Sequence, residues 1–195
     1  MVELTVYDES EKHPTTTRTI RIDSDLDKTL AEIAAEERIS VNSLINNALR
    51  KYSEWDVFAI KFGVITNFTV AAKKFIECQS DDQVKELGKW LGKNALKEFI
   101  IFWRKSLDVE GALKSIRILG GTGNYLYEEY VNNGHRIVVC KHDLGSKWSL
   151  YYESMFKSLF EDSLGIKVAT DCTEDQIVLN IPMRIESANH FYDDL

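Results

Sequence analysis

The sequence predicts an α+β fold, in which an N-terminal strand-helix-helix module is followed by a helical segment and an antiparallel ββαββ domain. Three patterns carry this prediction. An alternating strand and two amphipathic helices lie within residues 15–53, aromatic-rich helical periodicity follows, and two pairs of strands flank a helix beyond residue 125. With 195 residues, 44% of them hydrophobic, the chain can hold the small module and a domain of about 140 residues with its own core.

We expect the chain to divide into a mobile arm at residues 1–13, the module at 14–53 and the α+β domain at 54–195. The arm carries four acidic side chains and shows no consistent period. No signal peptide precedes it, and charged and polar residues interrupt the most apolar run, residues 58–75. The three cysteines are widely spaced and odd in number, unlike a disulfide framework. These features indicate a soluble protein of the reducing cytoplasm, without a membrane partner.

The predicted strand runs from Thr17 to Ile22. With a period of two, Ile20 and Ile22 share one face with Arg18, while the other face is polar and consists of Thr17, Thr19 and Arg21. One face of the strand is therefore suited to packing on helices and the other to contacts outside the module.

Two amphipathic helices follow the strand. In the first, side-chain acceptors at residues 23–25 precede an apolar stripe at Leu26, Leu30 and Ile33. Residues 37–39 make a tight connection. Ser40 is then a natural N-cap for a second helix, whose apolar side consists of Val41, Leu44, Ile45, Ala48, Leu49 and Tyr52.

A module of about forty residues with one unpaired strand cannot bury enough surface to fold alone. A second copy of the chain is the expected partner. If two copies pair their strands antiparallel, the isoleucines lie on the four helices and the polar faces project together as a two-stranded ribbon. Such a ribbon fits the DNA major groove.

The order and spacing of residues 15–53 resemble the ribbon-helix-helix repressors, the Arc, MetJ and CopG group. The sharpest match is the run Ser40-Val41-Asn42-Ser43, which is similar to the same run in Arc. The resemblance implies that Thr17, Thr19 and Arg21 read bases, and that the first amides of the second helix, at Ser40, Val41 and Asn42, bind a phosphate. A helix N-terminus also favours an anion for its own physical reasons.

The chain departs from this family at two positions. Arg38 stands in the turn between the helices, where the family often has glycine, so a left-handed cap there would be borne by a non-glycine residue. Arg18 stands where many members have an apolar residue, and we expect it to turn toward a phosphate. Among the readers, Arg21 should discriminate most, because a guanidinium can bond a guanine edge bidentately.

The net charge of −7 argues against DNA binding only if it is taken over the whole chain. Residues 12–52 contain seven basic and six acidic side chains, which gives +1 for this stretch and −8 for the remainder of the chain. An acidic body behind a nearly neutral reading surface predicts modest affinity and strong salt dependence.

We therefore expect a homodimeric, sequence-specific transcriptional regulator, such as a repressor of the CopG family, that binds double-stranded DNA. The alternatives are a scaffold protein whose N-terminal unit only dimerises, a DNA-binding antitoxin without a sensory role, and an architectural DNA binder, against which the acidic body argues. No catalytic pattern is present, so an enzyme and a cofactor are not expected.

Beyond Ser53, three- and four-residue spacing predicts a long helix from residue 55 to 76, continuing from the helix of the module. A second helix begins near Asp81 and extends to Trp103; Gly88 and Gly92 on it would let another helix approach closely. A third spans residues 109–119 and ends at the glycine cluster 120–123, which lacks the strand and the Lys-Ser/Thr of a phosphate loop.

The remaining sequence predicts two hairpins around a helix. Strands at 125–131 and 136–142 flank an Asn-Asn-Gly turn, residues 148–164 form a helix, and strands at 166–173 and 176–182 form the second hairpin. Together with Gly88, Gly92 and the glycine cluster, this closing half is similar to the 4-vinyl-reductase-like and heme-nitric-oxide-binding-like sensor domains. The resemblance implies a domain for a small apolar effector or for further dimerisation, even to a tetramer, and gives no ligand residues.

Two side-chain clusters of this domain leave alternatives open. Cys140 and His142 share one face of a strand, and Cys172 lies on a strand that could neighbour it. Three such ligands would suit zinc, copper or nickel. The alternative, which we favour, is a buried cysteine and a surface histidine without metal. A set of aromatic residues could line an apolar pocket or pack in the core, namely Trp90, Trp103, Tyr151, Tyr152 and Phe156.

Overall fold

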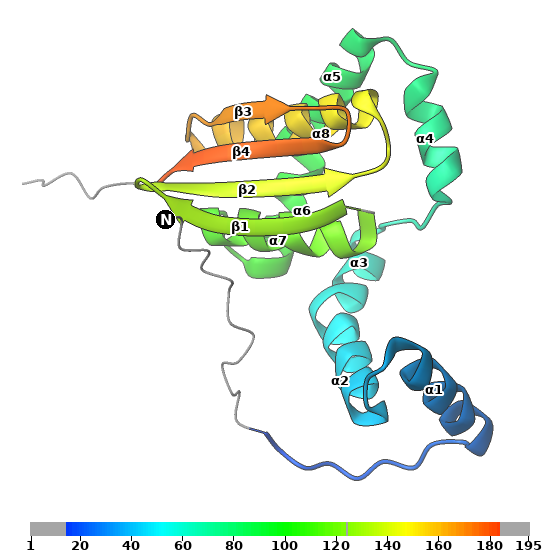
Figure 1. Ribbon diagram of the computed structural model, residues 1–195. Coiled ribbons are helices and arrows are strands. Elements are labelled where there is room, and N and C mark those ends of the chain that lie inside the picture. The colour runs from blue at the N-terminus through cyan, green and yellow to red at the C-terminus, as the bar shows by residue number, and fades with distance from the viewer. Residues whose placement is uncertain (1–14, 124, 184–195) are drawn as a thin grey trace, which may run out of the picture. The chain divides into compact units, whose positions relative to one another are not determined.

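The computed structural model describes residues 15–123 and 125–183 (Figure 1). The predicted mobile arm, residues 1–13, lies outside the described residues. The described residues form two compact units, one within residues 15–66 and one within residues 67–183. Within the described ranges, no helix combines the length and the apolar character needed to cross a membrane.

The N-terminal unit contains an extended segment and a helical pair. Residues 15–23 have no regular secondary structure, so the predicted strand at 17–22 is not formed in the single chain. A β-strand is defined by hydrogen bonds to a neighbouring backbone, and among the described residues no strand pairs with this segment. Helices α1 (Ser24–Glu37) and α2 (Val41–Lys51) follow as the periodicity predicts.

Helix α2 continues beyond the module. It passes through a π-helical turn, η1 (Tyr52–Asp56), into α3 (Val57–Phe62), which confirms the predicted continuation past Ser53. The prediction that one helix reaches residue 76 is wrong, because α3 ends at Gly63, whose φ of 88° is a left-handed C-cap. Five residues separate this cap from helix α4 (Thr69–Glu77).

The larger unit has the predicted order of helices followed by ββαββ, an α+β fold (Figure 1). Its elements are α5 (Asp81–Leu91), η2 (Gly92–Leu96), α6 (Lys97–Arg104), α7 (Val109–Gly123), β1 (Tyr125–Asn132), β2 (His135–His142), α8 (Ser146–Ser158), η3 (Leu159–Ser163), β3 (Ala169–Cys172) and β4 (Gln176–Pro182). Helix α7 runs through the glycine cluster instead of ending before it, and β3 is shorter than predicted.

The sheet is antiparallel throughout, in the order β1-β2-β4-β3. Helices α7 and α8 lie on one face of it (Figure 1). Alternate residues of the central strands point into this layer and are fully buried, among them Val138 and Cys140 on β2 and Ile177 and Leu179 on β4. The core therefore lies between the sheet and the helices, as the period-two pattern requires.

The predicted close approach at Gly88 and Gly92 is confirmed. A Cβ atom added at Gly88 would lie 2.5 Å from the carbonyl oxygen of Tyr151, and one at Gly92 would lie 2.1 Å from that of Met155. Both carbonyls belong to α8. Only glycine lets the backbones of the two helices meet at this distance.

Candidate nucleic-acid interface

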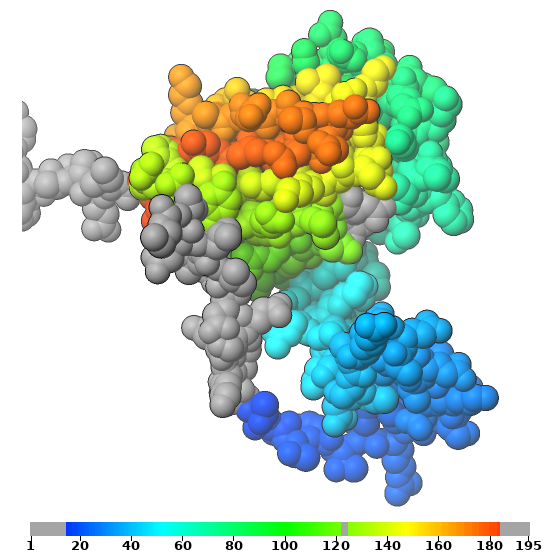
Figure 2. All heavy atoms as spheres, in the orientation of Figure 1, coloured from blue at the N-terminus to red at the C-terminus, as the bar shows by residue number. Residues whose placement is uncertain are grey.

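The extended N-terminal segment presents the predicted base-reading side chains to solvent. Thr17, Arg18, Thr19 and Arg21 are all exposed. Figure 2 shows residues 15–23, in dark blue, as a thin strip of atoms beside the first helices. Within the described part of the chain, neither arginine forms an ion pair. Both guanidinium groups are therefore placed to meet an external anion or base edge.

The turn between α1 and α2 has the conformation that the sequence predicted. Arg38 is left-handed, with φ 57° and ψ 38°. The Ile39 N–H donates to the carbonyl oxygen of Ala34 at 3.0 Å, and the Arg38 N–H to that of Ala35 at 3.3 Å. This pair of bonds is a Schellman motif. The expectation that a non-glycine residue bears the left-handed cap is confirmed.

The N-terminus of α2 is capped and still has two free donors. The Ser43 N–H donates to Ser40 Oγ at 3.0 Å, which confirms Ser40 as the N-cap. Among backbone acceptors of the described residues, none receives the N–H of Val41 or Asn42. Since the first amides of a helix point outward and carry its positive dipole end, these two are oriented to bind a phosphate oxygen.

The apolar sides of the module are not covered within one chain. None of the residues of α2 is buried, and in α1 only Ala34 is. Large apolar side chains are exposed on the extended segment, on both helices and on the turn that follows, at Ile20, Leu26, Ile33, Leu49 and Tyr52. Amphipathic helices gain most of their stability by burying the apolar face, and the described residues leave most of this face exposed.

The proposed metal ligands do not converge. Ile177 of β4 pairs with Cys140 on one side and Cys172 on the other, so the prediction that these strands could be neighbours is wrong. One intervening strand puts the two cysteine backbones roughly 10 Å apart, whereas thiolates sharing a zinc each lie about 2.3 Å from it. No group of three candidate metal ligands occurs among the described residues.

His142 is buried, not on the surface as predicted. Its Nδ1 accepts from the Leu144 N–H at 3.2 Å, and its Nε2 lies 3.1 Å from Ser149 Oγ, which donates to the carbonyl oxygen of Glu174. Burial lowers the pKa of His142, against the opposing charges of Asp175 and Asp143. The neutral ring therefore has both nitrogens engaged and acts as a structural link between β2 and α8.

The two cysteine thiols of the sheet are held protonated. Burial raises the pKa of Cys140 to about 12. Burial, followed by the neighbouring Glu153 carboxylate, raises that of Cys172 to about 12. Since thiolates are the species that bind metals and act as nucleophiles, neither cysteine is prepared for such chemistry.

The aromatic side chains pack in the core and do not line a common pocket. Tyr152 stacks on Phe156 with centroids 5.7 Å apart, and contacts Tyr151 at 5.4 Å. Two predicted members lie elsewhere, because Trp103 stacks on Phe99 and Trp90 is exposed. Sequence reasoning missed Tyr125, whose ring meets that of Tyr152 edge to face; its signal is its position on the inward face of β1.

The exposed segment and the helical pair fall within a known family pattern. Residues 9–49 match the sequence model of the HicB family. The matched stretch is about a fifth of the chain and includes residues 15–23, α1 and most of α2. It overlaps the region that resembles ribbon-helix-helix repressors and gives no separate support to the CopG group. No curated protein sequence matches the chain.

Proposed function

We propose that this protein is a homodimeric, sequence-specific DNA-binding regulator of the cytoplasm that reads the major groove with a two-stranded ribbon. The observation that carries the proposal is the exposed, unpaired segment at 15–23 beside two helices whose apolar faces are uncovered. Pairing the segment with that of a second copy would satisfy its backbone groups and bury those faces together.

In such a dimer the alternation of the strand assigns each side chain a role. Ile20 and Ile22 pack on the helices. The polar face, with Thr17, Thr19 and Arg21, enters the groove, where the arginine can bond a guanine bidentately. The flanking phosphates are bound by the amides of Val41 and Asn42 behind the Ser40 cap, and by Arg18.

The family match supports this assignment. HicB is an antitoxin with a DNA-binding N-terminal region like that of ribbon-helix-helix proteins, and the match covers the proposed ribbon and phosphate site. The same match favours a second candidate function, that of a DNA-binding antitoxin whose larger unit binds a partner protein. In the first candidate that unit senses a small apolar effector or joins dimers into tetramers.

The test is a gel shift of the full chain on DNA fragments selected from the genome by the protein itself. Arg21→Ala should lose at least tenfold in affinity for the selected site and little for random DNA, because one bidentate contact is worth about 1–3 kcal/mol. Lys28→Ala is the matched control, since Lys28 is an exposed cation on α1 of the same unit.

A salt titration separates DNA binding from dimerisation alone. Affinity that depends on phosphate contacts falls steeply as salt rises, and association of two protein chains through apolar faces does not. Full, sequence-specific affinity in Arg21→Ala would refute the ribbon assignment. A dimer that binds neither selected nor random DNA would favour the scaffold function.

A further inference from the structure

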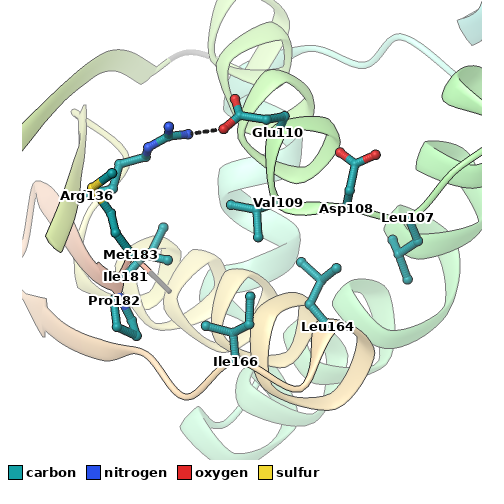
Figure 3. A pocket seen from close by; sticks show the side chains of 10 residues that line it. All are labelled: Leu107, Asp108, Val109, Glu110, Arg136, Leu164, Ile166, Ile181, Pro182 and Met183. Atoms are coloured by element: carbon teal, nitrogen blue, oxygen red, sulfur yellow. Dashed lines mark hydrogen bonds and ion pairs between the residues drawn. The ribbon is translucent and has the colours of Figure 1, made fainter. Parts of the chain in front are cut away.

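The larger unit has an apolar groove that contains none of the proposed DNA-binding residues. It has a volume of about 450 Å³, within the range of small-molecule sites. The chain forms it from four places: the start of α7 with the two residues before it, the segment after η3, the end of β4, and Arg136 of β2 (Figure 3). Its apolar lining consists of Leu107, Val109, Leu164, Ile166, Ile181, Pro182 and Met183.

On one side of the groove lies Arg136, which pairs with two glutamates that differ in solvent exposure. Arg136 NH1 donates to Glu110 Oε1 at 2.7 Å (Figure 3), and its Nε lies 3.3 Å from Glu129 Oε1. The Glu129 side chain is 9% exposed, whereas that of Glu110 is 67% exposed. Glu129 is thus a fixed partner, and Glu110 reaches the arginine from solvent.

Glu129 is also bound by two other groups. Its Oε2 accepts from Arg117 at 3.0 Å and from the hydroxyl of Tyr127 at 2.6 Å. Burial and this carboxylate hold the pKa of Tyr127 far above its usual value. Arg117 and Arg136 therefore share the carboxylate of Glu129, and the exposed Glu110 supplies the second negative charge of this cluster.

We propose that the groove binds an apolar monocarboxylate, whose carboxylate replaces that of Glu110 on Arg136 while its hydrocarbon body lies on the apolar lining. The ion pair with Glu110 shows which group the arginine accepts at this position. An exposed ion pair contributes little free energy, so its exchange for a ligand carboxylate costs little, and the ligand gains the burial of its body.

The other acidic residue of the lining does not compete for the arginine. Asp108 caps α7: it accepts from the Gly111 N–H and the Ser106 hydroxyl, each at 2.7 Å. These bonds hold its pKa below the usual value. A cationic ligand would meet Arg136 at the same edge and is disfavoured. The proposal goes beyond DNA binding and stands whether or not the N-terminal unit binds DNA.

The experiment measures binding of decanoate, decanol and decylamine, each below its micellar concentration, to the full chain by calorimetry. Decanoate should bind at one site per chain, decanol more weakly and decylamine not at all. Glu110→Gln, which removes the exposed one of the two carboxylates paired with Arg136, should tighten decanoate roughly two- to fivefold, the range set by an exposed ion pair. Arg136→Gln should weaken it at least tenfold.

Glu128→Gln is the matched control. Glu128 is an exposed acidic residue of β1 that pairs with Lys141, and it does not line the groove. The variant should leave decanoate affinity unchanged. Glu110→Gln keeps the test valid if Arg136→Gln fails to fold. The proposal would be overturned if decanoate did not bind, if decanol bound equally well, or if Glu110→Gln left the affinity for decanoate unchanged. Methyl NMR gives a further check: shifts induced by decanoate at residues other than Val109, Leu164 and Ile166 would also overturn it.

Discussion

Replacing Gly92 by alanine should force α5 and α8 apart. The new Cβ would lie 2.1 Å from the carbonyl oxygen of Met155 and 3.0 Å from the backbone N of Leu159. Both are backbone atoms, so no side chain can move aside. Overpacking of a core costs about 1–3 kcal/mol, and the gain in helix propensity returns about 1 kcal/mol; with rigid backbone on both sides we expect a net loss of about 2 kcal/mol.

Gly121→Ala is the matched control for this prediction. Gly121 is also helical and exposed, and a Cβ there would have no neighbour within 4 Å. It should gain up to about 1 kcal/mol from propensity alone. Urea unfolding of both variants, followed by circular dichroism, gives the two free energies. If Gly92→Ala were as stable as the original chain, the close contact of α5 with α8 would be refuted.

Three further predictions concern single side chains. Ser40→Ala should destabilise the N-terminal unit by about 1 kcal/mol, because the cap of α2 is lost, and denaturant unfolding measures it; an unchanged midpoint would contradict the cap. The exposed Cys78 should react with a thiol reagent in the native protein while the buried Cys140, with its pKa raised to about 12, does not; equal rates would contradict its burial. Because the pKa of His142 is lowered in the folded protein, the unfolded chain binds the proton more tightly. The contribution of His142 to the free energy of unfolding is therefore complete above about pH 6.5 and is lost as the pH falls below that value. NMR titration of the imidazole ring should show a midpoint below about 6.5, and a higher midpoint would refute the burial of this ring.

Local patterns predicted most of the elements and their close contacts. Ser40 as a cap, Arg38 as a left-handed turn residue and the glycines at 88 and 92 could be predicted because each depends on the backbone geometry of its own helix end or face. The two hairpins were equally accessible, since turn residues and alternation lie within a few positions of each other.

The features that the sequence did not predict depend on residues that lie far apart along the chain. The separation of Cys140 from Cys172 follows from the position of β4 between β2 and β3, which no local pattern specifies. The break at Gly63 was hidden inside a continuous apolar run. The groove beside Arg136 was not foreseen, because four parts of the chain that lie far apart in the sequence form it.

The pairing of two N-terminal segments is the claim on which the proposed function depends. Hydrogen–deuterium exchange of the amides at 17–22, measured across protein concentrations that span dissociation of the dimer, tests it most directly. We predict that alternate amides become protected as the dimer forms, since antiparallel pairing bonds every second residue to the other chain. Exchange that stays unprotected while the measured mass is that of a dimer would contradict the ribbon.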